Sequence, residues 1–152
     1  MNKIFKLISA ILICHVAGIL GAFFTTPQID GWYSTLVKPS FNPPSWIFGP
    51  VWLTLYTLMG FSLFLIWQNK GNKKAVSWFY LQLLLNASWS IIFFGAHELF
   101  LAFIIILAMI LSVIKTMLEF WKINRTSVYL LVPYLLWISF AGFLNYSIWI
   151  LN

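Results

Sequence analysis

Residues 39–69 read PSFNPPSWIFGPVWLTLYTLMGFSLFLIWQN and carry no charged side chain. A helix needs about 20 apolar residues to cross the hydrocarbon core of a bilayer, which is about 30 Å thick. The part of this stretch that follows the prolines is long enough and apolar enough to do so. We therefore predict a membrane-spanning helix at 45–68.

Four further stretches of the sequence are also uncharged and apolar, although the one at 99–114 is shorter than a full membrane span. Lysine and glutamate near a helix end reach the interface along their apolar stems, so Lys115 and Glu119 allow this span to be completed. The chain is thus predicted to form one all-α membrane domain over 1–152, a bundle of five transmembrane helices. The spans are expected near 5–26, 45–68, 75–95, 98–119 and 127–150, with a connecting loop at 27–44.

The composition excludes an ordinary cytosolic enzyme, a disordered chain and a secreted disulfide scaffold. Apolar residues make up 62% of the chain and charged residues 8%, whereas soluble domains contain about 45–50% and about 25%. The single cysteine, Cys14, can form no intrachain disulfide.

The apolar run after Lys6 continues to Phe24, which is long for the core of a signal peptide, and no Ala-x-Ala site follows it. We therefore expect the first helix to be retained.

The net charge of +6 is distributed unevenly along the chain. With five spans, Lys38 is the only basic residue that falls on one side of the membrane. The positive-inside rule then places the N-terminus in the cytoplasm, and the C-terminus and the 27–44 loop across the membrane. Because the other basic residues lie between apolar spans, we interpret them as topology signals and expect no nucleic-acid partner. The expected location is a bacterial inner membrane.

The 27–44 loop is stiff and partly apolar. Three prolines in its second half, Pro39, Pro43 and Pro44, prevent a regular helix across it. A flexible tether would instead be rich in glycine and serine. Two interpretations stay open. The loop either anchors in the headgroup layer, or it forms a lid over a cavity in the bundle.

Two prolines fall inside predicted spans, and each is followed by a tryptophan: Pro50 by Trp52, and Pro133 by Trp137. A proline removes a backbone donor, and a kink beside a large ring is one way to open a pocket. The alternative is that both prolines lie near a helix start and cost little. Because a buried indole N–H needs an acceptor, the deep tryptophans predict polar partners such as Asn86 and Asn145. Such residues either have a functional role or join helices.

Ala17 and Gly21 lie four residues apart in the first span, as do Gly18 and Ala22. Small residues at this spacing let helices approach closely. The stripe predicts either a homodimer contact through Ala17 and Gly21 or packing within the bundle.

No catalytic group of residues is visible in the sequence. The three acidic residues lie in different loops or helix ends, and His15 and His97 lack the spacing of metal ligands. We expect His15 to be an ordinary packed histidine. No metal and no cofactor are predicted.

Three blocks of residues stand in order along nearly the whole chain. They read Trp32-Tyr33-x2-Leu36-x-Lys38-Pro39-x-Phe41-x-Pro43-Pro44-x-Trp46-x-Phe48-Gly49-Pro50-Val51-Trp52-x2-Leu55-Tyr56-x2-Met59-Gly60, then Gln82-x3-Asn86-x2-Trp89 followed by Phe93-Phe94-Gly95-Ala96, and then Pro133-Tyr134-x2-Trp137-x2-Phe140-Ala141-x2-Leu144-Asn145. In order and spacing, these blocks resemble the TspO/MBR family of translocator proteins and tryptophan-rich sensory proteins.

The resemblance implies a five-helix bundle that encloses a ligand cavity, which the first loop closes. It implies that Trp52 and Trp137 form aromatic walls and that Ala141 leaves room for the ligand. The other implied positions are Trp89 and Asn86 in the third span, and Trp32 and Pro43 in the loop. Porphyrins are among the ligands of the family, and their propionate groups are anionic. Lys38 and N–H groups of the loop are therefore the expected partners of these propionates.

Family ligands include porphyrins, sterols and isoquinoline or benzodiazepine drugs, and members commonly form dimers. The resemblance therefore implies a membrane receptor or sensor that binds a flat amphipathic molecule, such as protoporphyrin IX, as a ligand and not as a cofactor. One alternative is light- and oxygen-dependent degradation of porphyrin, with Trp52 and Trp137 in a photochemical role. Another is passive transport of porphyrin or sterol-like molecules. Whether the chain is an enzyme stays open at this point.

The sequence departs from the family in three places. Ile105 stands where some members carry an acidic residue, and Leu101 where some carry an aromatic one. No lysine or arginine follows 144–146, where vertebrate members carry a proposed cholesterol motif, which is a weak pattern even when complete. Recognition of sterols by that route is therefore not implied, whereas porphyrin binding is less affected.

Overall fold

The computed structural model describes residues 2–69 and 72–152, which form helices joined by short connections. In this part of the chain, five helices are long and apolar enough to cross a membrane, which confirms the predicted bundle. The elements are α1 (Lys3–Ile29), α2 (Trp32–Thr35), the 3-10 turn η1 (Ser45–Ile47), α3 (Phe48–Gln68), α4 (Lys73–Ser90), its π-helical continuation η2 (Ile91–Gly95), α5 (Leu99–Trp121) and α6 (Arg125–Leu151).

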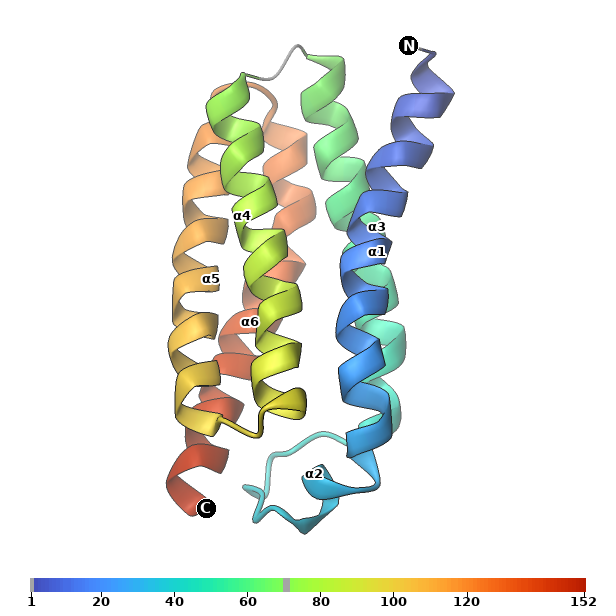
Figure 1. The fold of residues 1–152 in the computed structure, drawn as a ribbon. Coiled ribbons are helices and arrows are strands. Elements are labelled where there is room, and N and C mark those ends of the chain that lie inside the picture. Colours follow the sequence, from blue (N-terminus) through green and yellow to red (C-terminus); the bar gives the residue numbers. More distant parts are fainter. Residues whose placement is uncertain (1, 70–71) are drawn as a thin grey trace.

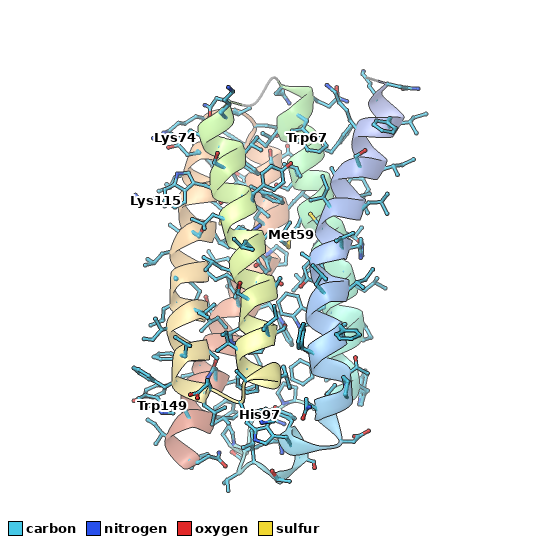
Figure 2. All side chains as sticks on the ribbon, viewed as in Figure 1. Met59, Trp67, Lys74, His97, Lys115 and Trp149 are labelled. Atoms are coloured by element: carbon cyan, nitrogen blue, oxygen red, sulfur yellow. The ribbon has the colours of Figure 1, made fainter. Side chains whose placement is uncertain are left out.

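The five long helices pack as a ring in the order α1, α3, α6, α5, α4, in which each contacts its two neighbours (Figure 1). The two termini lie at opposite ends of the bundle. The end that carries the C-terminus also carries α2 and the connection to α3, and we call it the lid end. Lys74 and Lys115 lie toward the opposite end (Figure 2). Lys70, which the topology prediction also uses, lies outside the described residues.

Asparagine side chains cap three of the long helices at the end opposite the lid. The side-chain oxygens of Asn2, Asn72 and Asn124 each accept a hydrogen bond from a backbone N–H of the first turn. Such caps satisfy donors that the helix itself leaves unpaired and contribute about 1 kcal/mol each. They explain why α1, α4 and α6 begin where they do.

Small residues bring α1 close to α3 and α4. A Cβ added at Gly60 would lie 2.6 Å from the Cα of Ile11, and one added at Gly21 would lie 2.9 Å from Oγ of Ser90. Ala17 is 8% exposed. The stripe of Ala17 and Gly21 thus takes part in packing within the bundle, which is one of the two predicted alternatives. The homodimer stays a prediction.

The connection between α1 and α3 begins later than expected. The sequence predicted a loop at 27–44, whereas α1 continues through Pro27 and ends at Ile29. We call residues 30–44 the lid loop, and its first part forms the single helical turn α2. Pro50 lies in the first turn of α3, where its missing N–H costs little, while Pro133 lies well inside α6.

Candidate ligand-binding cavity

A cavity of about 330 Å³ lies between α1, α3, the α4–η2 segment and α6, toward the lid end. Its volume falls within the range of small-molecule sites, about 300–1,000 Å³. Most of the lining side chains are apolar or aromatic. They are His15, Gly18, Ile19, Gly21, Ala22, Thr25, Thr26, Ile29, Tyr33, Ser45, Phe48, Gly49, Trp52, Leu53, Tyr56, Asn86, Trp89, Ser90, Phe93, Phe94, Trp137, Ala141, Leu144, Asn145 and Ile148.

Three pairs of aromatic rings form much of the wall. The ring of Trp52 stacks on that of Tyr56, with centroids 5.3 Å apart. The ring of Trp89 stacks on that of Phe93 at 5.0 Å, and Trp137 meets Phe48 edge to face at 6.0 Å. Packed rings of this kind hold one another in place and present flat apolar surfaces. The cavity is therefore suited to a flat ligand.

A hydrogen-bonded group centred on Asn86 lies at the cavity wall. Tyr56 donates a hydrogen bond to Oδ1 of Asn86, whose Nδ2 donates to the hydroxyl of Tyr134 at 3.2 Å. The hydroxyl of Tyr134 in turn donates to the sulfur of Met109 at 3.4 Å. Four helices, α3, α4, α6 and α5, are joined in this way. Because buried polar groups are costly when unpaired, the network fixes the positions of the rings around it.

A second polar contact orients Trp89. Its indole Nε1 donates to Oδ1 of Asn145 at 3.0 Å, and Nδ2 of Asn145 donates to the carbonyl of Leu99 at 3.0 Å. This confirms Asn145 as an indole partner. Asn86, the other partner expected from the sequence, pairs with two tyrosines instead.

His15 lies on the cavity wall and contacts α3. Its Nε2 lies 3.1 Å from Oγ1 of Thr57, whose hydroxyl donates to the carbonyl of Leu53 at 2.9 Å. The contact joins α1 to α3 beside the cavity. The sequence predicted an ordinary packed histidine, and the structure adds that the ring borders the cavity.

The lid loop packs across the end of the bundle. Tyr33 is 6% exposed and donates to Oδ1 of Asn42 at 2.8 Å. Burial raises the pKa of Tyr33 to about 12, only partly offset by the hydrogen bond to Asn42, so the phenol keeps its proton at neutral pH. The ring of Tyr33 packs on Phe94 at 5.6 Å. Of the two interpretations of the loop, this placement supports a lid.

Two contacts hold the lid loop to the helix ends. Trp32 stacks on His97, with ring centroids 4.1 Å apart. His97 is labelled at the lid end in Figure 2. The backbone N–H of Val37 donates to Oδ1 of Asn152, and Nδ2 of Asn152 donates back to the carbonyl of Val37, both at 2.9 Å. The lid is thus fastened both to the α4–α5 turn and to the C-terminal residue.

The predicted site residues divide into two groups. Those in the helices all line the cavity; they are Trp52, Asn86, Trp89, Trp137 and Ala141. Those in the loop, Trp32, Lys38 and Pro43, do not. Nζ of Lys38 donates to the carbonyl of Leu36 at 3.1 Å and lies 4.8 Å from the ring centre of Tyr33. Lys38 therefore stabilises the lid loop and does not reach into the cavity.

The lining residues that sequence reasoning did not assign to the site include His15, Tyr56, Phe93 and Phe94. Tyr56 follows Trp52 by one helical turn, so the i,i+4 spacing was available as a signal. Phe93 and Phe94 lie in the π-helical turn η2, a geometry that often occurs at functional sites but has no clear pattern in one sequence.

Comparison with known proteins gives a consistent result over nearly the whole chain. A model described as the TspO/MBR family matches residues 10–150. The "Tryptophan-rich protein TspO" of Archaeoglobus fulgidus is 40% identical and covers 99% of both chains. The "Translocator protein" of Homo sapiens is 38% identical over 86% of this chain and 82% of its own. The "Tryptophan-rich sensory protein" of Cereibacter sphaeroides is 36% identical over 81% of this chain and 78% of its own.

Proposed function

Since the chain belongs to the TspO/MBR family, we propose that it is a membrane receptor that binds a flat amphipathic ligand, such as a porphyrin, in the cavity between its helices. The family and the five apolar helices make it an integral membrane protein. The names of its relatives, "Translocator protein" and "Tryptophan-rich sensory protein", are consistent with a role in binding or moving a small molecule.

The observation that carries the proposal is the pair of tryptophans on the cavity wall. Trp52 and Trp137 both line the cavity, and in the described part of the chain neither indole N–H donates a hydrogen bond to the protein. An indole presents a flat apolar face and a donor at its edge. A porphyrin has the matching chemistry, because its macrocycle is flat and apolar and its propionates accept hydrogen bonds. These indoles replace Lys38 as the proposed partners of the propionates.

We expect Trp52→Phe and Trp137→Phe each to weaken protoporphyrin IX binding about 10-fold, because each removes part of a stacking surface and one donor. Affinity would be measured in the dark, by titrating purified protein and following intrinsic fluorescence. Trp121→Phe is the matched control, since Trp121 packs on Tyr129 and Arg125 at the far end of α5. Quenching that does not saturate, or that is the same in all three variants, would mean that porphyrin only partitions into detergent.

We also propose that the protein lies in a bacterial inner membrane with its N-terminus in the cytoplasm. The support is the excess of basic residues at the end opposite the lid. In a Cys14→Ala background, we expect a membrane-impermeant thiol reagent added to intact spheroplasts to label Asn152→Cys and not Lys3→Cys. The reverse pattern would contradict the orientation.

A further inference from the structure

Part of the cavity wall also belongs to the outer surface of the bundle. Ile19 on α1 and Leu53 on α3 both line the cavity, yet they are 67% and 62% exposed. Both residues lie within helices that are apolar enough to span a membrane. A side chain that borders the cavity and also faces outward marks an opening, and this opening lies at the depth of the lipid.

The opening follows from how α1 and α3 pack along their length. Away from the lid end they touch, since a Cβ added at Gly60 would meet the backbone of Ile11, and one added at Gly18 would meet the ring of Tyr56. Nearer the lid end, a Cβ added at Gly49 would meet nothing within 4 Å, and Gly49 lines the cavity and is exposed. The side of α3 that borders the cavity is therefore open at this level.

Contacts join α1 to the α4–η2 segment and hold the lid loop to the helix ends. On the opposite side of α1, a Cβ added at Gly21 would lie 2.9 Å from Oγ of Ser90, and one added at Gly95 would lie 3.0 Å from the ring of Phe24. At the lid end, the Trp32–His97 stack and the paired hydrogen bonds between Val37 and Asn152 hold the lid loop in place. The gap between α1 and α3 differs from these places, because the cavity-lining residues Ile19 and Leu53 beside it are exposed.

We propose that the cavity takes up its ligand sideways from the lipid bilayer, through the gap between α1 and α3, and not from water through the lid. This inference rests on the proposed function, because it says that the proposed ligand reaches the cavity from the lipid bilayer. The rim of the gap includes the hydroxyl-bearing residues Thr26 and Ser45, both exposed and close to the lid end. The geometry thus suits membrane-dissolved molecules that have a flat apolar body and a polar edge at the interface.

The test compares binding rates in lipid vesicles that contain the full-length protein and pre-dissolved protoporphyrin IX, followed by porphyrin absorbance. Leu53→Trp narrows the gap, and we expect its association and dissociation rates to fall together, each by about 10-fold. A lost contact would instead raise the dissociation rate. Leu84→Trp is the matched control, because Leu84 is an equally exposed leucine, at 65%, on α4. Rates in Leu53→Trp equal to those of the control would overturn the proposal.

A second variant tests the competing route. In a Cys14→Ala background, Val37→Cys and Asn152→Cys would be joined by a short bis-maleimide linker, which locks the lid loop to the end of α6. We expect the locked protein to load porphyrin from vesicles at the unlocked rate. A block on loading in the locked protein would overturn the lateral route while leaving binding in the cavity intact. Absence of saturable binding in the unmodified protein would instead refute the proposed function itself.

Discussion

We expect Gly60→Ala to destabilise the bundle by about 3 kcal/mol, at the upper end of the range for overpacking a well-packed interface. The added Cβ would lie 2.6 Å from the Cα and 3.0 Å from the backbone N of Ile11, as well as 2.9 Å from its Cγ1. A side chain can rotate away from such a clash, but a helix backbone cannot. The substitution therefore forces α1 away from α3 over the length at which the two helices are in closest contact.

The stability would be measured as the free energy of unfolding in mixed detergent micelles, with sodium dodecyl sulfate as denaturant. Gly142→Ala on α6 is the matched control, because Gly142 is also buried inside a helix but its added Cβ would meet the nearest atoms at 3.6 Å. There the change should be neutral or stabilising, since alanine is favoured over glycine in helices by about 0.5–1 kcal/mol. Equal losses at both positions would show that the contact with Ile11 is not what makes Gly60 sensitive.

The helices were predictable because membrane spans are determined largely by composition. Uncharged apolar runs placed each span end within three residues of the structure, as the third predicted span, 75–95, and the observed Lys73–Gly95 illustrate. The end of α1 was harder to place, since Pro27 was read as the start of a loop. A proline in the last turn removes only one helical hydrogen bond, so α1 continues to Ile29.

The aromatic walls could be identified through the family resemblance, whereas the contribution of α1 could not. The sequence of α1 is apolar on nearly every face, so its pattern does not show which side faces the cavity. That side is set by packing, in which Gly18 receives the ring of Tyr56 and thereby turns His15 toward α3 and the cavity. Contacts of this kind depend on two helices that are distant in the sequence.

The position of Lys38 in the structure has a different physical reason. A positive charge in the only long loop is a natural partner for an anionic ligand, but carbonyls of the same loop lie within its reach. Nζ of Lys38 bonds those of Ser34 and Leu36. Nζ of Lys38 bonds these nearby carbonyls because ordering a few neighbouring residues costs less conformational entropy than holding the long side chain over the cavity.

Ala141→Phe should lower the affinity for protoporphyrin IX by at least about 100-fold, which corresponds to about 2.7 kcal/mol. Ala141 lies one turn after Trp137 on α6, and both line the cavity. A phenyl ring at this position would occupy space against the face of Trp137 on which we propose the macrocycle stacks. The ring would fill a void and displace few atoms, so thermal stability should change much less than binding.

The same titration on Ser139→Phe separates loss of space from a general effect of bulk on α6, because Ser139 is exposed on that helix and does not line the cavity. We expect this control to bind like the unmodified protein. If Ala141→Phe also binds normally while both variants remain folded, the porphyrin must lie elsewhere on the protein. The tryptophan results would then have to reflect a change in structure, because a macrocycle that contacts Trp137 within a cavity of about 330 Å³ must compete with a new phenyl ring one turn away.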